Sequence, residues 1–272
     1  MNGPAGSPDP SGSLPDQTPQ PPAPRAVRVA LPEALPRVTY ALLGVTVAVY
    51  VLQLASVFLI GYANRPAQMD WLEFYGARIN PLIRAGELWR LITPVLLHAS
   101  IPHILFNMYA LFSFGAALER FFGRPRFLLL YLLAAFSGNV FSFLLGSENG
   151  YSVGASTAIF GLVGAQGVFL YQNRRLFGSQ FRRAIGNVVF IVAINLFLGL
   201  SPGIDNWGHI GGLLGGLIFT WFAGPRWAVE GIPPDLKLVD ERQPREVLNG
   251  AAAVTLIFGA LAALGLLYSP GR

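Results

Sequence analysis

The fold is decided by residues 154–171, which read GASTAIFGLVGAQGVFLY. This run is apolar along its length, yet Ser156 stands near its start. A second apolar run, residues 206–223, reads NWGHIGGLLGGLIFTWFA and has His209 near its start. Polar and ionisable side chains are costly in hydrocarbon, so they are functional candidates and each calls for a partner. Ser156 and His209 are the natural partners of each other.

The composition is that of an integral membrane protein. Of the 272 residues, 53% are hydrophobic and only 12% are charged, which is far too apolar for an ordinary soluble domain. A helix needs about 20 mostly apolar residues to cross a bilayer. The sequence therefore predicts an all-α polytopic membrane protein with seven spans. They lie at approximately 38–60, 99–119, 127–146, 153–173, 184–200, 207–223 and 248–268.

Residues 1–36 differ in kind from the rest of the chain. Pro, Gly and Ser recur there, and large apolar side chains are almost absent before Val27. Such a segment cannot bury a core, so we expect a disordered tail. Residues 37–272 then form the transmembrane domain. The first apolar run starts near Val38 and is long enough to span, so no cleavable signal peptide is expected.

The basic residues predict the orientation in the membrane. With the N-terminus in the cytoplasm, the outside segments hold only Arg65, Arg78, Arg84, Arg90 and Arg272, and every other Lys and Arg lies inside. This asymmetry follows the positive-inside rule and predicts a cytoplasmic N-terminus and an outside C-terminus. It also accounts for the basic charge without a nucleic-acid partner. Because the tail does not resemble a mitochondrial presequence, we expect a multi-pass protein of a bacterial-type cytoplasmic cell membrane.

The connection 61–98 is expected on the outer face. Its aromatic and aliphatic residues alternate with charged residues and with Asn80-Pro81. This pattern is typical of a segment that lies partly in the membrane interface, so we expect short, laterally packed helical pieces. A solvated loop with a few aromatic anchors is the alternative.

Small residues predict which helices touch. Gly212 and Gly216 are four residues apart in the sixth span, and Gly161 and Gly164 lie in the fourth. Small residues at such spacing allow helix backbones to approach closely in lipid. The fourth and sixth spans are therefore expected to pack together, which would join the serine and the histidine at their outer ends.

Ser156 and His209 suit nucleophilic catalysis. A hydroxyl is a weak nucleophile until a base takes its proton, and imidazole is the side chain best matched to that task near neutral pH. Ser156 is expected about one turn into the fourth span, at the same depth as His209. A serine bonded to its own helix backbone is the structural alternative. The matched depth favours a catalytic pair and suggests intramembrane proteolysis.

The other two histidines, His98 and His103, lie on the same side of the membrane. His103 and Asn107 are four residues apart, so they share a helical face and present two donors in a row. Donors placed in this way suit an oxyanion hole, which stabilises the charge that develops on an attacked carbonyl. Hydrogen bonds that serve packing alone are the alternative.

Neither a metal nor a cofactor is expected. The chain has no Cys, which excludes thiolate ligands, disulfides and a Cys nucleophile. Three histidines at one depth suggest a zinc site as an alternative. Two observations argue against it: there is no His-Glu-x-x-His run, and Ser156 would have no role in such a site. No apolar span contains an Asp, which argues against aspartyl proteolysis. A small transporter is a further alternative, but its polar residues would gather near the midplane.

Together these motifs resemble those of the rhomboid intramembrane serine proteases. The match covers roughly Trp89 to Gly216, and the flanking spans fit the variant with a six-helix core plus one C-terminal helix. The matching motifs are Trp89-Arg90, His98, His103-Ile104-Leu105-Phe106-Asn107, Gly115-x-x-x-Glu119-x-x-x-Gly123, Gly154-Ala155-Ser156 and Gly208-His209-x-x-Gly212-x-x-x-Gly216. Several independent motifs in one order make the resemblance specific.

The resemblance implies a serine endopeptidase in which Ser156 is the nucleophile and His209 its base, without an acidic third member. It implies oxyanion contacts from His103, Asn107 and the backbone N–H of Ser156. His98 would support the same cavity. The implied substrates are transmembrane segments of other membrane proteins, cut near the outer face. A rhomboid-like protein that binds membrane clients without cleaving them is the alternative.

Three further positions follow from the resemblance. Gly154 would lie beside the oxyanion hole. Phe160 stands where the family often has a Tyr that stacks on the base, and Phe keeps the stacking but lacks the hydroxyl. Thr157 stands where Gly commonly follows the nucleophile, so it is expected to narrow substrate choice or slow the enzyme.

Glu119 and the Trp89-Arg90 pair are expected to be structural, with Glu119 bonding backbone or Arg120.

Overall fold

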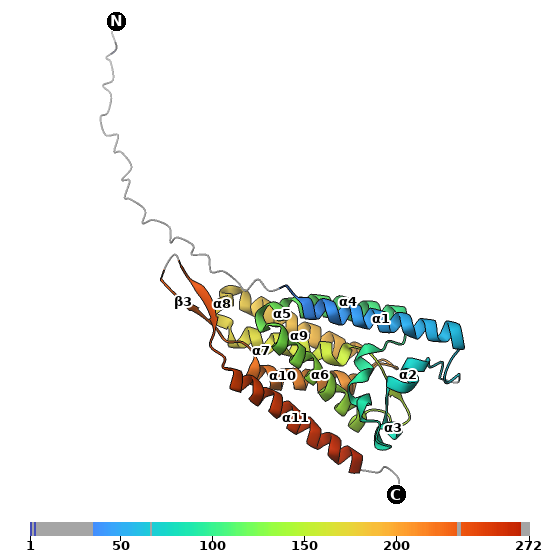
Figure 1. Cartoon of the computed structure of the whole chain (residues 1–272). Helices are drawn as coiled ribbons and strands as arrows, with labels where there is room; N and C mark the ends of the chain where they lie inside the picture. Colours follow the sequence, from blue (N-terminus) through green and yellow to red (C-terminus); the bar gives the residue numbers. More distant parts are fainter. Residues whose placement is uncertain (2, 4–34, 66, 233–234, 268–272) are drawn as a thin grey trace.

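The computed structural model describes residues 1, 3, 35–65, 67–232 and 235–267. The predicted disordered tail therefore lies almost entirely outside the described residues. Figure 1 shows long helices that run side by side along one axis. One end of the bundle carries α2 (Trp71–Gly76) and α3 (Asn80–Arg84), and the other carries α8 (Arg174–Phe177) and the hairpin that starts with β3 (Trp227–Glu230).

The long helices follow the predicted spans closely. They are α1 (Arg37–Ile60), α4 (Ile101–Ala110), α5 (Ala116–Phe122), α6 (Arg124–Leu145), α7 (Ser156–Gln172), α9 (Phe181–Leu198), α10 (Asn206–Ala223) and α11 (Pro244–Leu267). A π-helical turn, η3 (Leu111–Gly115), joins α4 to α5, and α8 (Arg174–Phe177) with η4 (Gly178–Gln180) precedes α9.

Five helical segments of the described chain are long and apolar enough to cross a membrane. They are Arg37–Ile60, Ile101–Phe122, Arg124–Leu145, Arg174–Leu198 and Pro244–Leu267. The two helices that carry Ser156 and His209 are not among them, because α7 has 17 residues and α10 has glycines and polar residues in its 18. The chain is a multi-pass membrane protein with a helical fold.

Helix α10 packs against both α7 and α6 at the centre of the bundle. The contact with α7 is made by glycines: a Cβ added to Gly212 would overlap the carbonyl oxygen of Thr157, and one added to Gly216 would overlap that of Gly161. Such backbone contact requires the absence of side chains on α10. The predicted packing of these two helices is confirmed.

Helix α1 is tied to the bundle at its first turn by Glu119 of α5. The Glu119 carboxylate is fully buried and accepts hydrogen bonds from the backbone N–H groups of Val38 at 2.9 Å and Thr39 at 2.7 Å. It also accepts one from the Thr39 hydroxyl at 2.7 Å. These N–H groups have no acceptor within α1, so Glu119 serves as its cap. Its partner is the backbone of α1, and not Arg120.

The segment between α1 and α4 consists of short pieces, as predicted. They are α2 (Trp71–Gly76), β1 (Arg78–Ile79), α3 (Asn80–Arg84), η1 (Leu88–Leu91) and η2 (Thr93–Leu96). Arg90 is buried here and donates to the carbonyl oxygens of Phe74 and Ala77, each at 2.8 Å. Strand β1 pairs with β2 (Tyr151–Ser152), which leads into α7. The segment therefore braces the entry to α7.

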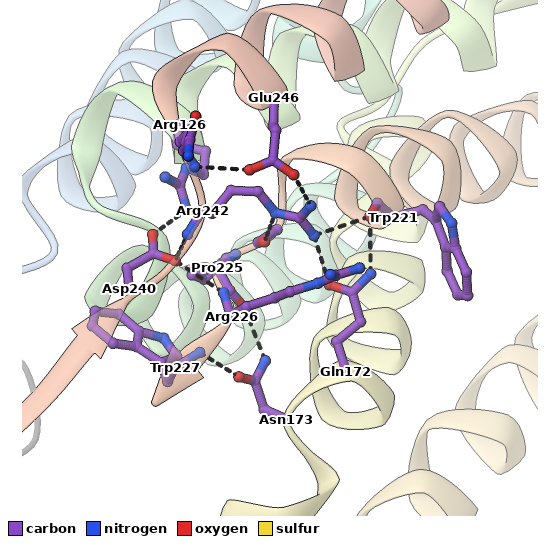
Figure 2. Close-up of polar contacts among 12 residues, drawn as sticks. Arg126, Gln172, Asn173, Trp221, Pro225, Arg226, Trp227, Asp240, Arg242 and Glu246 are labelled. Atoms are coloured by element: carbon purple, nitrogen blue, oxygen red, sulfur yellow. Dashed lines mark hydrogen bonds and ion pairs between the residues drawn. The ribbon is translucent and has the colours of Figure 1, made fainter. Parts of the chain in front are cut away.

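The opposite end of the bundle is closed by a hairpin that the sequence reasoning did not predict. Strands β3 (Trp227–Glu230) and β4 (Lys237–Asp240) pair antiparallel. Figure 2 shows how the adjoining residues reach the helix ends: Arg242 donates to the carbonyls of Trp221 and Gly224, and Asn173 donates to that of Pro225. The carbonyls of Trp221 and Gly224 are ones that the end of α10 leaves without a helical partner, so Arg242 caps this helix.

Candidate active site

Ser156 and His209 meet at the end of the bundle that carries α2 and α3. Ser156 is the first residue of α7 and His209 lies in the first turn of α10. The Nε2 atom of His209 lies 2.9 Å from the Oγ atom of Ser156. This is hydrogen-bond distance for a base that takes a proton from a hydroxyl.

The start of α7 differs from the sequence expectation, which put Ser156 one turn into a helix. Gly154 has a φ of +127°, a backbone conformation that residues other than glycine rarely adopt. Its N–H donates to the carbonyl of Pro94 at 2.9 Å. The helix therefore begins only at Ser156, and no side chain caps it at Ala155. The N–H groups of the first turn have no intrahelical acceptor, so that of Ser156 is open to a ligand.

The imidazole of His209 is held by stacking. The ring of Phe160, one turn further along α7 from Ser156, lies parallel to it with centroids 4.2 Å apart and an interplanar angle of 9°. His209 is 8% exposed, and its Nδ1 atom has no hydrogen-bond partner in the described chain. The carboxylate of Asp205 instead accepts from Gly208 N–H at 2.9 Å and from the Ser142 hydroxyl. The geometry is a pair of residues without an acidic third member.

His103 of α4 faces the loop before the serine. A Cβ built on Gly154 would lie 2.7 Å from Nε2 of His103 and 3.7 Å from the Ser156 hydroxyl. Gly154 is thus the spacer between the imidazole and the hydroxyl, and its missing side chain leaves room there. The His103 imidazole and the Ser156 hydroxyl therefore both border the space that a side chain at position 154 would fill.

His98 lies behind this pair and is almost completely buried, at 1% exposure. Its Nε2 accepts a hydrogen bond from the N–H of Ala155 at 3.4 Å, and its ring meets that of His103 edge to face with centroids 5.0 Å apart. Burial and the neighbouring His103 lower the pKa of His98 to about 3. His98 is therefore neutral near pH 7, with its ring proton on Nδ1.

Asn107 lies one turn below His103 and is 6% exposed. Its amide nitrogen donates to the carbonyl oxygen of His103 at 3.1 Å. An amide carries two N–H donors, so one remains for another acceptor. The residue is placed on the same face as His103, as the spacing predicted.

Thr157 does not lie where the sequence expectation put it. Its side chain is buried, and it faces Gly138 of α6 and Gly208 of α10, where added Cβ atoms would come within 2.6 Å and 2.9 Å of it. Thr157 therefore fills the junction of α6, α7 and α10. Its expected effect on substrate choice or rate stays a prediction, and the contacts of the side chain are with α6 and α10.

Sequence reasoning missed Gln53 of α1. Its side chain hydrogen-bonds to both backbone groups of His98 and to Asp70. An amide inside an apolar span was the available signal. Within the described residues, no group of three or more His, Asp or Glu side chains is arranged to hold a metal ion.

Comparison with known proteins places this geometry in a family. The family model described as the rhomboid domain matches residues 85–226. The chain belongs to the rhomboid family. The match includes the connecting segment from η1 onwards and every helix from α4 to α10, and therefore both halves of the Ser156–His209 pair.

Several curated relatives of this rhomboid chain carry rhomboid names. It is 44% identical over 167 residues to "Rhomboid protease GluP" of Bacillus subtilis (strain 168), covering 61% of the chain and 32% of GluP. It is 37% identical over 191 residues to "RHOMBOID-like protein 2" of Arabidopsis thaliana, covering 69% and 60%. "RHOMBOID-like protein 6, mitochondrial", from the same plant, is 44% identical over 148 residues, covering 54% and 45%. The chain thus spans about a third to three fifths of these relatives.

Proposed function

We propose that this chain is an intramembrane serine endopeptidase that cleaves transmembrane segments of membrane-protein substrates near the outer face. The observation that carries the proposal is the 2.9 Å approach of His209 Nε2 to Ser156 Oγ inside a membrane-spanning helical bundle. The GluP match, a relative named as a protease, supports the same reaction class.

In the proposed reaction, His209 takes the Ser156 proton as the hydroxyl oxygen attacks the substrate carbonyl carbon. The oxyanion of the tetrahedral intermediate would accept hydrogen bonds from the Ser156 N–H, His103 and Asn107. His209 then returns the proton to the leaving amine, and the C–N bond breaks to leave an acyl-serine. A water molecule, deprotonated by His209, releases the second fragment and restores the serine. Phe160 would hold the imidazole ring in place throughout.

The proposal includes the full topology. Helices α7 and α10 would complete seven spans, with the N-terminus in the cytoplasm and the site open to the outer face. A substrate helix would have to unwind there, because a helical carbonyl is already hydrogen-bonded and shielded. We further propose a bacterial-type cytoplasmic membrane as the location. Family membership alone does not select it, since one relative is named as mitochondrial and another as chloroplastic.

The test is cleavage of a reporter transmembrane segment with small residues near its outer end. Purified protein in detergent is compared with Ser156→Ala and His209→Ala, and the fragments are identified by mass. We expect product from the wild type and a loss of about a thousandfold or more in each variant. Equal cleavage by Ser156→Ala would refute the assigned chemistry. A silent wild type that still binds such segments would favour a rhomboid-like protein that holds clients without cutting them.

A further inference from the structure

Gln53 is an unusual residue for its helix. Only 11% of the apolar window of α1 is buried, so most of this helix faces outward from the bundle. Its buried residues are Thr39, Thr46 and Gln53, spaced seven apart on one stripe. Thr39 bonds to Glu119 at one end, and Gln53 lies toward the other end, level with the active site. Gln53 is 2% exposed, so its amide requires partners within the protein.

Both functional groups of the amide are committed to His98. The Gln53 oxygen accepts from the backbone N–H of His98 at 3.1 Å, and the Gln53 nitrogen donates to the backbone carbonyl of His98 at 3.3 Å. One side chain therefore holds both backbone groups of one residue. His98 lies in the turn between η2 and α4, so Gln53 supplies there the hydrogen bonds that a helix would otherwise give.

Asp70 determines which way the amide points. The Gln53 nitrogen donates to the Asp70 carboxylate at 2.7 Å, and an ionised carboxylate only accepts. The amide nitrogen must therefore face Asp70, which leaves the oxygen for the His98 N–H. Asp70 is itself fixed as the N-cap of α2, where it accepts from Leu72 and Glu73 N–H at 2.8 Å and 3.0 Å.

His98 contacts two parts of the proposed oxyanion side of the site. Its ring accepts from Ala155 N–H, immediately before the serine, and packs against the ring of His103. A shift of the His98 backbone would move both contacts. A displacement of about 1 Å can cost roughly a hundredfold in rate when the reacting groups themselves are intact.

We propose that Gln53 is a positioning residue of the active site, which fixes His98 and through it the loop before Ser156 and the imidazole of His103. The inference rests on the proposed peptidase function and extends it to α1, a helix that contributes no residue to the Ser156–His209 pair. Gln53 itself touches neither the serine nor the histidine base.

The decisive variant is Gln53→Glu, because a protonated carboxyl keeps the acceptor and one of the two donors of the amide, and an ionised carboxyl has no donor. When this carboxyl is ionised, its oxygens would be repelled by the Asp70 carboxylate and by the carbonyl oxygen of His98. We therefore expect the ratio of variant to wild-type kcat to lie within about threefold of unity at low pH and to fall about ten- to a hundredfold as the new carboxyl ionises. KM should change little. Gln53→Met, which cannot make these bonds, should be slow at every pH.

Taking the ratio at each pH removes the titration of groups shared with the wild type. Those that face Gln53 or its partners are Asp70, Glu73, Tyr50, Tyr151, His98 and His103. The matched control is Thr46→Val, an isosteric change at a buried α1 hydroxyl that has no hydrogen-bond partner among the described residues. It should cleave at the wild-type rate at all pH values. A melting temperature for each variant shows that the fold is retained.

The same comparison is made with a fluorophosphonate that labels an activated serine, so that it does not depend on the choice of substrate. Wild-type kinetics and labelling in both Gln53→Glu and Gln53→Met would overturn the inference while leaving the peptidase proposal intact. A ratio for Gln53→Glu that does not change with pH would overturn it too. If the wild type neither cleaves nor is labelled at Ser156, the proposed function itself is wrong, and this inference falls with it.

Discussion

Gly154 is constrained both by its backbone conformation and by its contact with His103. Its φ of +127° suits only glycine, and an added Cβ would approach His103 Nε2 to 2.7 Å. We predict that Gly154→Ala lowers kcat by about a hundredfold or more, because the imidazole or the loop must move. Gly44→Ala is the control, since no atom of the described part of the chain lies within 4 Å of a Cβ there. Reporter cleavage measures both, and an active Gly154→Ala would contradict the assigned oxyanion geometry.

Glu73 is a buried carboxyl whose charge opposes folding. Burial and the adjacent Asp70 raise its pKa from 4.5 to about 7. A carboxyl with a higher pKa in the folded than in the unfolded state binds its proton more tightly when folded, so stability falls as pH rises between these values. We predict that Glu73→Gln, which keeps the cap on Asp70 N–H, raises the free energy of unfolding at about pH 8 by about 3 kcal/mol and changes it little at about pH 4.

The Glu73 prediction is checked by denaturant unfolding of both proteins at the two pH values. Glu230→Gln on the exposed end of β3 is the matched control, because it removes a carboxyl that is not buried. A stability gain of the same size at both pH values would show that the gain comes from packing and not from the charge of Glu73.

At the scale of elements, the contact between α7 and α10 sets the distance from serine to histidine. Gly212 has no room for a side chain beside the Thr157 carbonyl. We predict that Gly212→Ala destabilises the protein by about 1–3 kcal/mol and lowers activity, since overpacking pushes the helices apart. Gly259→Ala on α11 is the control, because a Cβ there meets nothing within 4 Å. Equal unfolding curves for the two variants would contradict this account of the helix contact.

The sequence predicted the helices better than their ends and connections. Apolar length locates α1, α6 and α11 because a span must match the bilayer. The start of α7 was missed by three residues, since the conformation of Gly154 depends on its contact with Pro94, far away in the chain. The β3–β4 hairpin was missed because its pairing is short, and the bonds that hold it come from residues such as Asn173 on other elements.

The candidate site was likewise predicted only in part. Depth and glycine spacing were enough to pair Ser156 with His209, because both are one-dimensional properties of a helix. The direction of the Thr157 side chain was not predictable, since it depends on the rotation of α7 against α6 and α10. The role of Gln53 was hidden for the same reason, because its partners lie in α2 and in the turn before α4.

At the scale of the whole molecule, the orientation in the membrane can be tested directly, because the two ends of the bundle differ in charge and in chemistry. The end with the Ser156–His209 pair carries few arginines, whereas the opposite end carries those of α8, α9 and the hairpin. Since the chain has no Cys, single cysteines report accessibility without background. We predict that Arg65→Cys is modified by an impermeant maleimide on intact cells, and that Lys237→Cys, also exposed, is modified only after lysis. The reverse pattern would put the Ser156–His209 pair on the cytoplasmic side and would restrict substrates of the proposed peptidase to segments presented there.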